Sequence, residues 1–269
     1  MNKQVLLVFL AIFTTQIVQA QSPWVREKGK AYVQIGFTGL YYNQVKLDGI
    51  TNTLPEDIND VTLQAYAEYG LSDKLEAQLV LPYKQIKIGS TSSHISGIGN
   101  VTVGLKYKLY DQKIKISSGL IYSANSITKN ANINLSTGFN AHTFVPYFTV
   151  GSSWGKLYYF GKLGYGYMTN NYSDYLSGTL EMGYEVIKKG HIILLFDTRN
   201  VISKESAFFN DVHQWSSYLD RQTFNAIGVK GNYEFIKDKI GVNFAYISAK
   251  GIDNAPLAPT LNLGIYKKL

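Results

Sequence analysis

The chain has no cysteine, which excludes a thiol nucleophile and a cysteine–zinc site, and it has only four histidines. His94 is flanked by Ser93 and Ser96, residue types that hydrolases combine with an orienting acid. Adjacency in a serine-rich segment is common by chance, because catalysis requires proximity in space rather than in sequence. The segment therefore favours a solvated loop over a hydrolase site.

Asp211 and His213 form a second acid–base candidate, in a polar segment where such a triplet also occurs by chance. His94, His142 and His213 lack the fixed spacing that zinc sites show. Gly97-Ile98-Gly99 resembles a phosphate loop only in composition, because it leads into an expected strand instead of a helix. We expect no catalytic residue, no metal and no cofactor, so the chain is predicted not to be an enzyme. A lipid hydrolase using His94 and His213 is the least favoured alternative.

The remaining chemistry lies in charged side chains at alternate positions of apolar segments. The candidates are Glu68, Glu76, Lys106, Lys108, Lys115, Lys162, Glu181, Asp197, Arg199 and Lys230. Half-buried charges need partners, and Glu68 and Glu76 flank the turn that precedes the segment with Lys106 and Lys108. This order predicts a carboxylate–ammonium ladder, which would hold strand register, set the selectivity of a polar passage, or do both.

Twelve segments of about ten residues position these charges, and in each of them polar and apolar residues alternate as in a two-faced strand. They span residues 31–41, 61–71, 75–83, 101–109, 114–122, 144–154, 157–168, 176–186, 192–200, 223–235, 239–247 and 259–266. Five tight turns alternate with six other connections, most of them longer: 43–60, 84–100, 124–142, 169–173, 201–222 and 248–258. An even number of strands with short turns on one side predicts an all-β, transmembrane antiparallel barrel with both termini in the periplasm.

Aromatic residues gather at both ends of the apolar face. Five lie beside the tight turns, namely Tyr69, Tyr107, Trp154, Tyr184 and Tyr233, and four beside the longer connections, namely Tyr41, Tyr83, Tyr122 and Tyr246. A bilayer selects such girdles at its two interfaces. The alternative is a secreted β-sandwich in which tyrosine is merely a good strand former. The inward aromatics Tyr32, Tyr66, Tyr158 and Phe160 would fill the lumen or offer a path to aromatic solutes.

The N-terminus resembles an export signal. Lys3 precedes an apolar core at residues 5–13, and Val18-Gln19-Ala20 forms a small-residue cleavage pattern. We expect a signal peptide at residues 1–20, a periplasmic lead at 21–30 and a barrel at 31–269, with a membrane anchor as the alternative for the apolar stretch. Export predicts a place in the bacterial outer membrane, with its lipid as partner. No long basic run suggests nucleic acid.

Several strings carry a family resemblance. They are Ser22-Pro23-Trp24, residues 68–75 (EYGLSDKL), Leu81-Pro82-Tyr83, Gly97-Ile98-Gly99-Asn100 and residues 104–109 (GLKYKL). Their order resembles the outer-membrane barrel family named for the meta-pathway of phenol degradation, and the composition is similar to that of Bacteroidetes-type proteins. The resemblance implies a transporter-like barrel that passes hydrophobic or aromatic compounds.

The function expected from these features is porin-like, passive transport or uptake of a small solute. The alternative is a surface-binding or adhesion barrel that acts through its long extracellular loops. Neither the solute nor the oligomeric state follows from the sequence, and neither does the open or closed state of the lumen.

Overall fold

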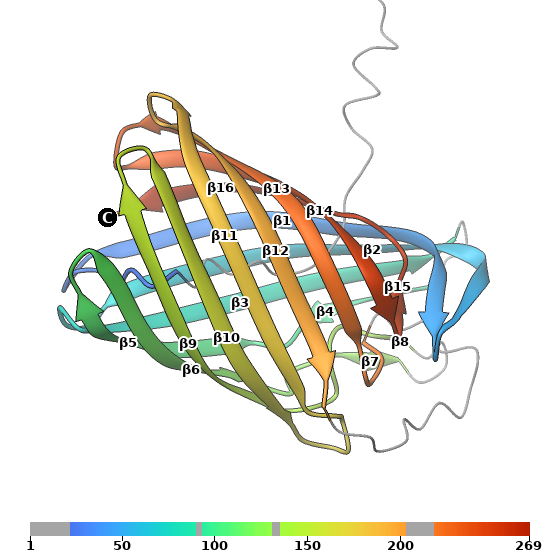
Figure 1. Ribbon diagram of the computed structural model, residues 1–269. Helices are drawn as coiled ribbons and strands as arrows, with labels where there is room; N and C mark the ends of the chain where they lie inside the picture. Colours follow the sequence, from blue (N-terminus) through green and yellow to red (C-terminus); the bar gives the residue numbers. More distant parts are fainter. Residues whose placement is uncertain (1–21, 90–92, 131–134, 203–217) are drawn as a thin grey trace, which may run out of the picture.

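Twelve long antiparallel strands close into a barrel in the computed structural model, which describes residues 22–89, 93–130, 135–202 and 218–269 (Figure 1). The wall consists of β1 (Ala31–Leu47), β2 (Ile50–Gly70), β3 (Leu75–Ile88), β5 (Thr102–Asp111), β6 (Ile114–Ser123), β9 (Thr143–Trp154), β10 (Leu157–Met168), β11 (Tyr175–Ile187), β12 (Gly190–Val201), β13 (Thr223–Ile236), β14 (Ile240–Asp253) and β16 (Thr260–Lys268). Four short strands lie in the connections: β4 (His94–Ile98), β7 (Lys129–Asn130), β8 (Leu135–Ser136) and β15 (Ala255–Pro256). The predicted twelve-stranded barrel is confirmed.

The first and last strands of the wall pair to close the barrel. β1 pairs with β16 in one unbroken register, from Tyr32 opposite Lys268 to Gly39 opposite Leu261. Ala31 and Leu269 exchange two backbone hydrogen bonds, of 3.0 and 2.8 Å. Closure leaves no unpaired edge, which a strand in hydrocarbon could not tolerate. The seam also places the beginning and the end of the wall at the end with the tight turns.

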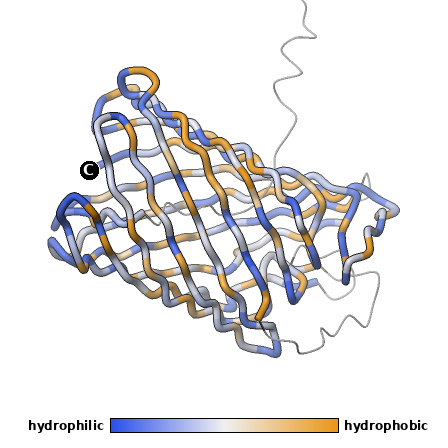
Figure 2. The backbone as a smooth tube through the Cα atoms, viewed as in Figure 1, coloured by the Kyte–Doolittle hydropathy of each residue, from blue (hydrophilic) through white to orange (hydrophobic). Residues whose placement is uncertain are grey.

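The two faces of each strand differ as the alternation predicts, and Figure 2 shows hydrophobic and hydrophilic residues following one another along the strands. In β3, Glu76, Gln78 and Val80 are buried inside, while Leu79 and Leu81 are exposed on the outer surface. Both girdles also face outward, with Trp154 at 84% exposure beside a tight turn and Tyr41 at 53% near the other end. No helix long and apolar enough to cross a membrane occurs in the described part of the chain.

The prediction of a long connection at residues 43–60 is wrong, because these residues continue β1 and β2 as one long hairpin. Leu47 pairs with Ile50 across a two-residue turn at Asp48 and Gly49, whose φ angles of 45° and 82° are those of the tight hairpin turns that match strand twist. β14 also runs further than expected, to Asp253. These extensions lack an apolar outer face, so the alternation on which the prediction rested fades there although the hydrogen-bonded ladder continues.

The inner side of the β1–β2 extension is apolar and packs on itself. We call this group the outer apolar cluster; it consists of Leu40, Tyr42, Val45, Ile58, Ile86, Ile88, Ile95 and Leu135, all at most 8% exposed. Its members come from β1, β2, β3, β4 and β8, so the long hairpin is fastened to the neighbouring wall and to an inward-folded connection. Apolar burial thus fills part of the extracellular end of the lumen.

Candidate functional site: the barrel lumen

The segment before β1 folds into the periplasmic end of the lumen. Residues 22–30, which we call the lead, run along the inner wall beside the β2–β3 turn. The indole of Trp24 packs edge-on against Tyr158 and Phe160, with ring centroids 6.0 and 6.3 Å apart. The Nε of Arg26 donates to Glu68 Oε2 at 2.7 Å, and its backbone nitrogen donates to Glu76 Oε2 at 2.8 Å. The lead is therefore held by both stacking and charge.

Lys106 completes this layer from β5, where it lies directly across the ladder from Glu76 of β3. Its Nζ lies 2.8 Å from Glu76 Oε1, and both side chains are fully buried. The same ammonium donates to the carbonyl oxygens of Trp24, at 2.7 Å, and Ser22, at 3.2 Å. All three protons of Lys106 are thus directed to acceptors, two of which belong to the lead.

The predicted ladder is confirmed for Glu76 with Lys106 and wrong for the other two residues. Glu68 pairs with Arg26, and Lys108 pairs with Asp111 at 2.7 Å, at the periplasmic rim. Arg26 was not predicted, because it lies outside the strands whose alternation identified the other charges. Burial opposes the charge of Arg26, but the neighbouring carboxylates Glu68 and Glu76 more than offset it and raise the pKa of the guanidinium.

Two glycines make room for the lead. A Cβ at Gly70 would lie 2.0 Å from the carbonyl oxygen of Glu27, and one at Gly151 would lie 2.8 Å from Pro23 Cγ and 2.6 Å from Phe160 Cβ. The Gly70 amide also donates to the carbonyl of Lys30 at 2.9 Å. The wall is thus shaped to receive the lead at these two points.

Three further predicted charges lie near the periplasmic end or just above it. Lys115 pairs with Asp111 at the rim. Lys230 pairs with Glu181, whose other oxygen accepts from the Tyr158 hydroxyl at 2.9 Å. Because Tyr158 also touches Trp24, this pair lies directly next to the lead.

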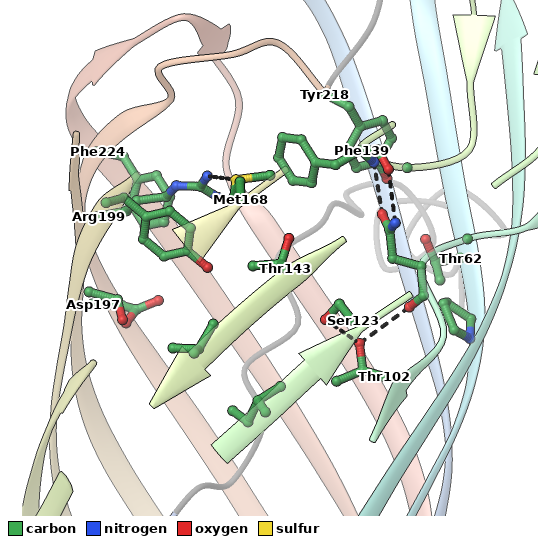
Figure 3. Close-up of a pocket in the computed structure, with 18 of the residues that line it drawn as sticks. Thr62, Thr102, Ser123, Phe139, Thr143, Met168, Asp197, Arg199, Tyr218 and Phe224 are labelled. Atoms are coloured by element: carbon green, nitrogen blue, oxygen red, sulfur yellow. Dashed lines mark hydrogen bonds between the residues drawn. The ribbon is translucent and has the colours of Figure 1, made fainter. Parts of the chain in front are cut away.

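A cavity of about 300 Å³ lies beyond these pairs (Figure 3). The last three predicted charges, Lys162, Asp197 and Arg199, line it. Lys84 was not predicted; it also lines the cavity and pairs with buried Asp60, 2.7 and 3.0 Å from its two carboxylate oxygens. Its alternation with Gln78 and Glu76 along β3 is the signal that could have identified it.

Asn100 fixes the extracellular side of this cavity. Its Nδ2 donates to the carbonyls of Ala124 and Phe139 at 2.9 Å, and its Oδ1 accepts from the Phe139 amide at 2.8 Å. The connection between β6 and β9 is thereby folded inward, and the Phe139 ring packs edge-on against Tyr218 at the cavity wall. The described parts of this connection, residues 124–130 and 135–142, do not project as the free loop that its length suggested.

Arg199 is the most unusual group in the cavity. Its guanidinium lies 3.7 Å from the ring centre of Tyr175 and 5.2 Å from that of Phe139, and Nη2 lies 3.3 Å from Met168 Sδ (Figure 3). Its Nε is buried with no hydrogen-bond partner among the described residues. Two aromatic rings therefore lie beside a planar cation whose Nε–H has no described acceptor.

The inward aromatics act mainly as filler. Tyr66 is buried and donates to Glu68 Oε1 at 2.6 Å, and Tyr32 stacks on Tyr266 with centroids 5.1 Å apart. Tyr158 and Phe160 receive Trp24. All four belong to the periplasmic half that the lead occupies.

The histidines do not converge in the described part of the chain. His94 begins β4, and His142 stacks on Tyr122 with its Nδ1 2.8 Å from the hydroxyl. Asp211 and His213, like the expected signal peptide, lie outside the described residues. Among the described side chains, no group of three His, Cys, Asp or Glu could hold a metal ion.

Comparison with known proteins agrees with this fold. Residues 59–189 match the family described as "Putative MetA-pathway of phenol degradation", which confirms the resemblance predicted from the sequence. An outer-membrane channel from Pseudomonas putida F1 superposes with a TM-score of 0.69 at 13% identity, over 94% of this chain and 99% of that chain. The KdgM porin gives a TM-score of 0.51 at 7% identity, over 88% and 97%. At these identities the likeness shows the fold, that of outer-membrane barrels. No curated protein sequence matches the chain.

Proposed function

Because this chain folds as an outer-membrane barrel and matches the phenol-degradation family over residues 59–189, we propose that it is a passive channel for small solutes in the bacterial outer membrane. The observation that carries the proposal is the cavity of about 300 Å³ within a wall whose outer face is apolar and whose inner face is polar. Such a wall isolates a polar compartment from lipid without any energy-coupling element. Export by a signal peptide at residues 1–20 is part of this proposal.

Solutes of this channel are small and include molecules with an apolar or aromatic body. Twelve strands enclose a narrower lumen than the sixteen to eighteen strands of open porins. The lead narrows the periplasmic half further, and the outer apolar cluster narrows the extracellular end. Phe139, Tyr218 and Phe224 line the cavity between them and offer apolar contact.

The lumen charges divide into two roles under this proposal. Glu68, Glu76 and Lys106 hold the lead, while Lys108 and Lys115 hold the periplasmic rim. Selectivity falls to the charges that line the cavity or lie between it and the lead, which are Lys162, Glu181, Asp197, Arg199 and Lys230.

Single-channel recording of the refolded chain 21–269 in a planar bilayer tests the channel. We expect small discrete current steps for this chain and larger ones for a chain that begins at residue 31, which lacks the lead. Liposome swelling with sugars of increasing size gives the size limit. If neither chain conducts although both run as folded barrels on gels, the channel is refuted.

The adhesion alternative receives less support from the described connections. The β1–β2 connection is a two-residue turn, and Asn100 draws the β6–β9 connection into the lumen. Apart from the β1–β2 hairpin, little described backbone is left to project as a binding loop. Replacing residues 203–217 with a short Gly-Ser linker should leave conductance intact, whereas an adhesion barrel would lose its partner.

A further inference from the structure

We infer that the cavity holds a specific site for a small organic anion, a carboxylate on an apolar body, with Arg199 as the carboxylate ligand. The inference rests on the proposed channel and names its substrate class. The guanidinium is planar, permanently charged and presents a fork of donors that matches a carboxylate. In the lumen, Glu76 forms an ion pair with Lys106, Asp60 with Lys84 and Glu181 with Lys230. Arg199 forms none among the described residues, which indicates a ligand that supplies a carboxylate.

Arg199 is positioned by two aromatic rings and a thioether, without a described carboxylate bound to its guanidinium N–H groups. The Cζ atom of Arg199 lies 3.7 Å from the ring centre of Tyr175 and 5.2 Å from that of Phe139, while Met168 Sδ takes one Nη2 proton as a weak acceptor. Nε is buried without any described hydrogen-bond partner, so the desolvation of that N–H remains uncompensated until an acceptor arrives.

Asp197 and Asp220 hydrogen-bond to residues other than Arg199, although Asp220 also acts electrostatically on Arg199. Asp197 accepts from Thr179 Oγ1 at 2.8 Å. Asp220 accepts from the backbone nitrogen of Ser173 at 2.7 Å and from its hydroxyl at 3.1 Å. Arg199 forms an ion pair with neither of them, nor with any other described residue. Lys162 lines the same cavity and acts electrostatically on Asp197, which reduces the repulsion that this carboxylate would exert on an anion.

The other lining explains why the anion carries an apolar body. Phe139, Met168, Tyr218 and Phe224 line the cavity beside Arg199, and Ile121 and Val145 line it as well. An inorganic anion would pair with the charge of the guanidinium but would leave the apolar side chains of the lining in contact with water. A volume of about 300 Å³ is at the small end of ligand pockets, which limits the body to about one ring.

Benzoate, benzamide and acetate are suitable probes for the intact refolded chain 21–269. Benzoate has both the charge and the ring, benzamide has the ring without the charge, and acetate has the charge without the ring. Isothermal titration in detergent at fixed ionic strength should give benzoate an affinity at least tenfold above both others. Equal binding of benzoate and benzamide would overturn the inference without recourse to any variant.

Arg199→Gln should lower benzoate affinity about tenfold to a hundredfold, the range expected when a charged hydrogen-bonded ligand contact is lost. Benzamide binding should change little, and Arg199→Lys should restore only part of the loss because an ammonium lacks the fork. Lys188→Gln is the matched control, since Lys188 is an exposed cation in the turn of the same β11–β12 hairpin. Unchanged benzoate affinity in a folded Arg199→Gln barrel would refute the assignment.

Binding and conduction distinguish the two proposals. A barrel that conducts ions but binds benzoate no better than benzamide remains a channel and lacks this site. A barrel that binds benzoate through Arg199 and conducts nothing, even without its lead, keeps the site and is not a channel. If acetate bound as tightly as benzoate, the part of the inference that requires an apolar body on the ligand would be wrong.

Discussion

Lys106 shows how strongly one buried residue can connect the lead to the wall. Its ammonium is fully buried against Glu76 and donates to two lead carbonyls. Removing one partner of a buried ion pair leaves an uncompensated charge, which costs about 3–5 kcal/mol. Lys106→Met should therefore lower the free energy of unfolding by about that amount, measured by urea titration of the refolded barrel.

Lys156→Met is the control for this prediction, because Lys156 is exposed in the β9–β10 turn. Its effect should stay within about 0.5 kcal/mol, as for most surface substitutions. Equal urea midpoints for Lys106→Met and the unmodified chain would show that this pair contributes nothing to stability.

Ion selectivity should depend on the charges of the cavity and not on those of the rim. In a chain without its lead, Lys162→Gln removes a cation from the cavity lining and should shift the reversal potential under a salt gradient toward cation preference. Lys108→Gln should shift it much less, because Lys108 is paired with Asp111 at the rim. A larger shift from Lys108→Gln would place the selective region at the periplasmic mouth.

At this scale the sequence predicts which residues face inward, but not all their partners. Alternation along the strands predicts that Glu76 and Lys106 share a face, and cross-strand neighbourhood predicts their pairing. Arg26 could not be predicted in the same way, because the path of a segment without secondary structure depends on contacts far along the chain. The sequence prediction already gives Glu68 and Glu76 two cationic neighbours, Lys106 and Lys108, so it carries no signal for Arg26.

Among the elements, the lead is the one whose removal should change function most. Gly70→Ala tests this with a single methyl group, because the added Cβ would lie 2.0 Å from the carbonyl oxygen of Glu27. We expect the lead to be displaced and the single-channel conductance to rise toward that of the chain lacking the lead, while the barrel still folds.

Gly161→Ala is the matched control on β10. Its added Cβ would first meet the flexible end of Leu180, at 3.1 Å, and it touches no lead residue. Conductance should therefore stay at the unmodified value. If Gly70→Ala also leaves conductance unchanged, the lead does not limit the pore.

The strands themselves were predictable wherever lipid faces them. The bilayer demands an apolar outer face, so alternation identifies each strand and its ends to within a few residues. Beyond the bilayer the outer face need not be apolar. Residues 50–59 of β2 accordingly include Asn52, Glu56 and Asp57, and their polar sequence is typical of a loop. There the strand is held by pairing with β1 and by the inward-facing outer apolar cluster, which only the folded chain reveals.

For the whole molecule, stability depends on closure between β1 and β16. A chain ending at residue 259 lacks β16 and leaves β1 and β14 with open edges. We expect it to lose the heat-modifiable mobility on gels that a closed barrel shows, whereas a chain without the lead should keep it. A truncated chain that still shifts on boiling would show that the seam is dispensable.

The charge balance of the lead layer has an electrical consequence. Arg26 and Lys106 offset Glu68 and Glu76, so the layer is neutral only while the lead is in place. Withdrawal toward the periplasm would move the charge of Arg26 through part of the transmembrane field and leave one negative charge of the layer uncompensated. A full crossing is worth about 2.3 kcal/mol per 100 mV. If the lead moves in this way, we expect potentials positive on the extracellular side to open the barrel and opposite potentials to close it, and Arg26→Gln should weaken this rectification in single-channel recordings.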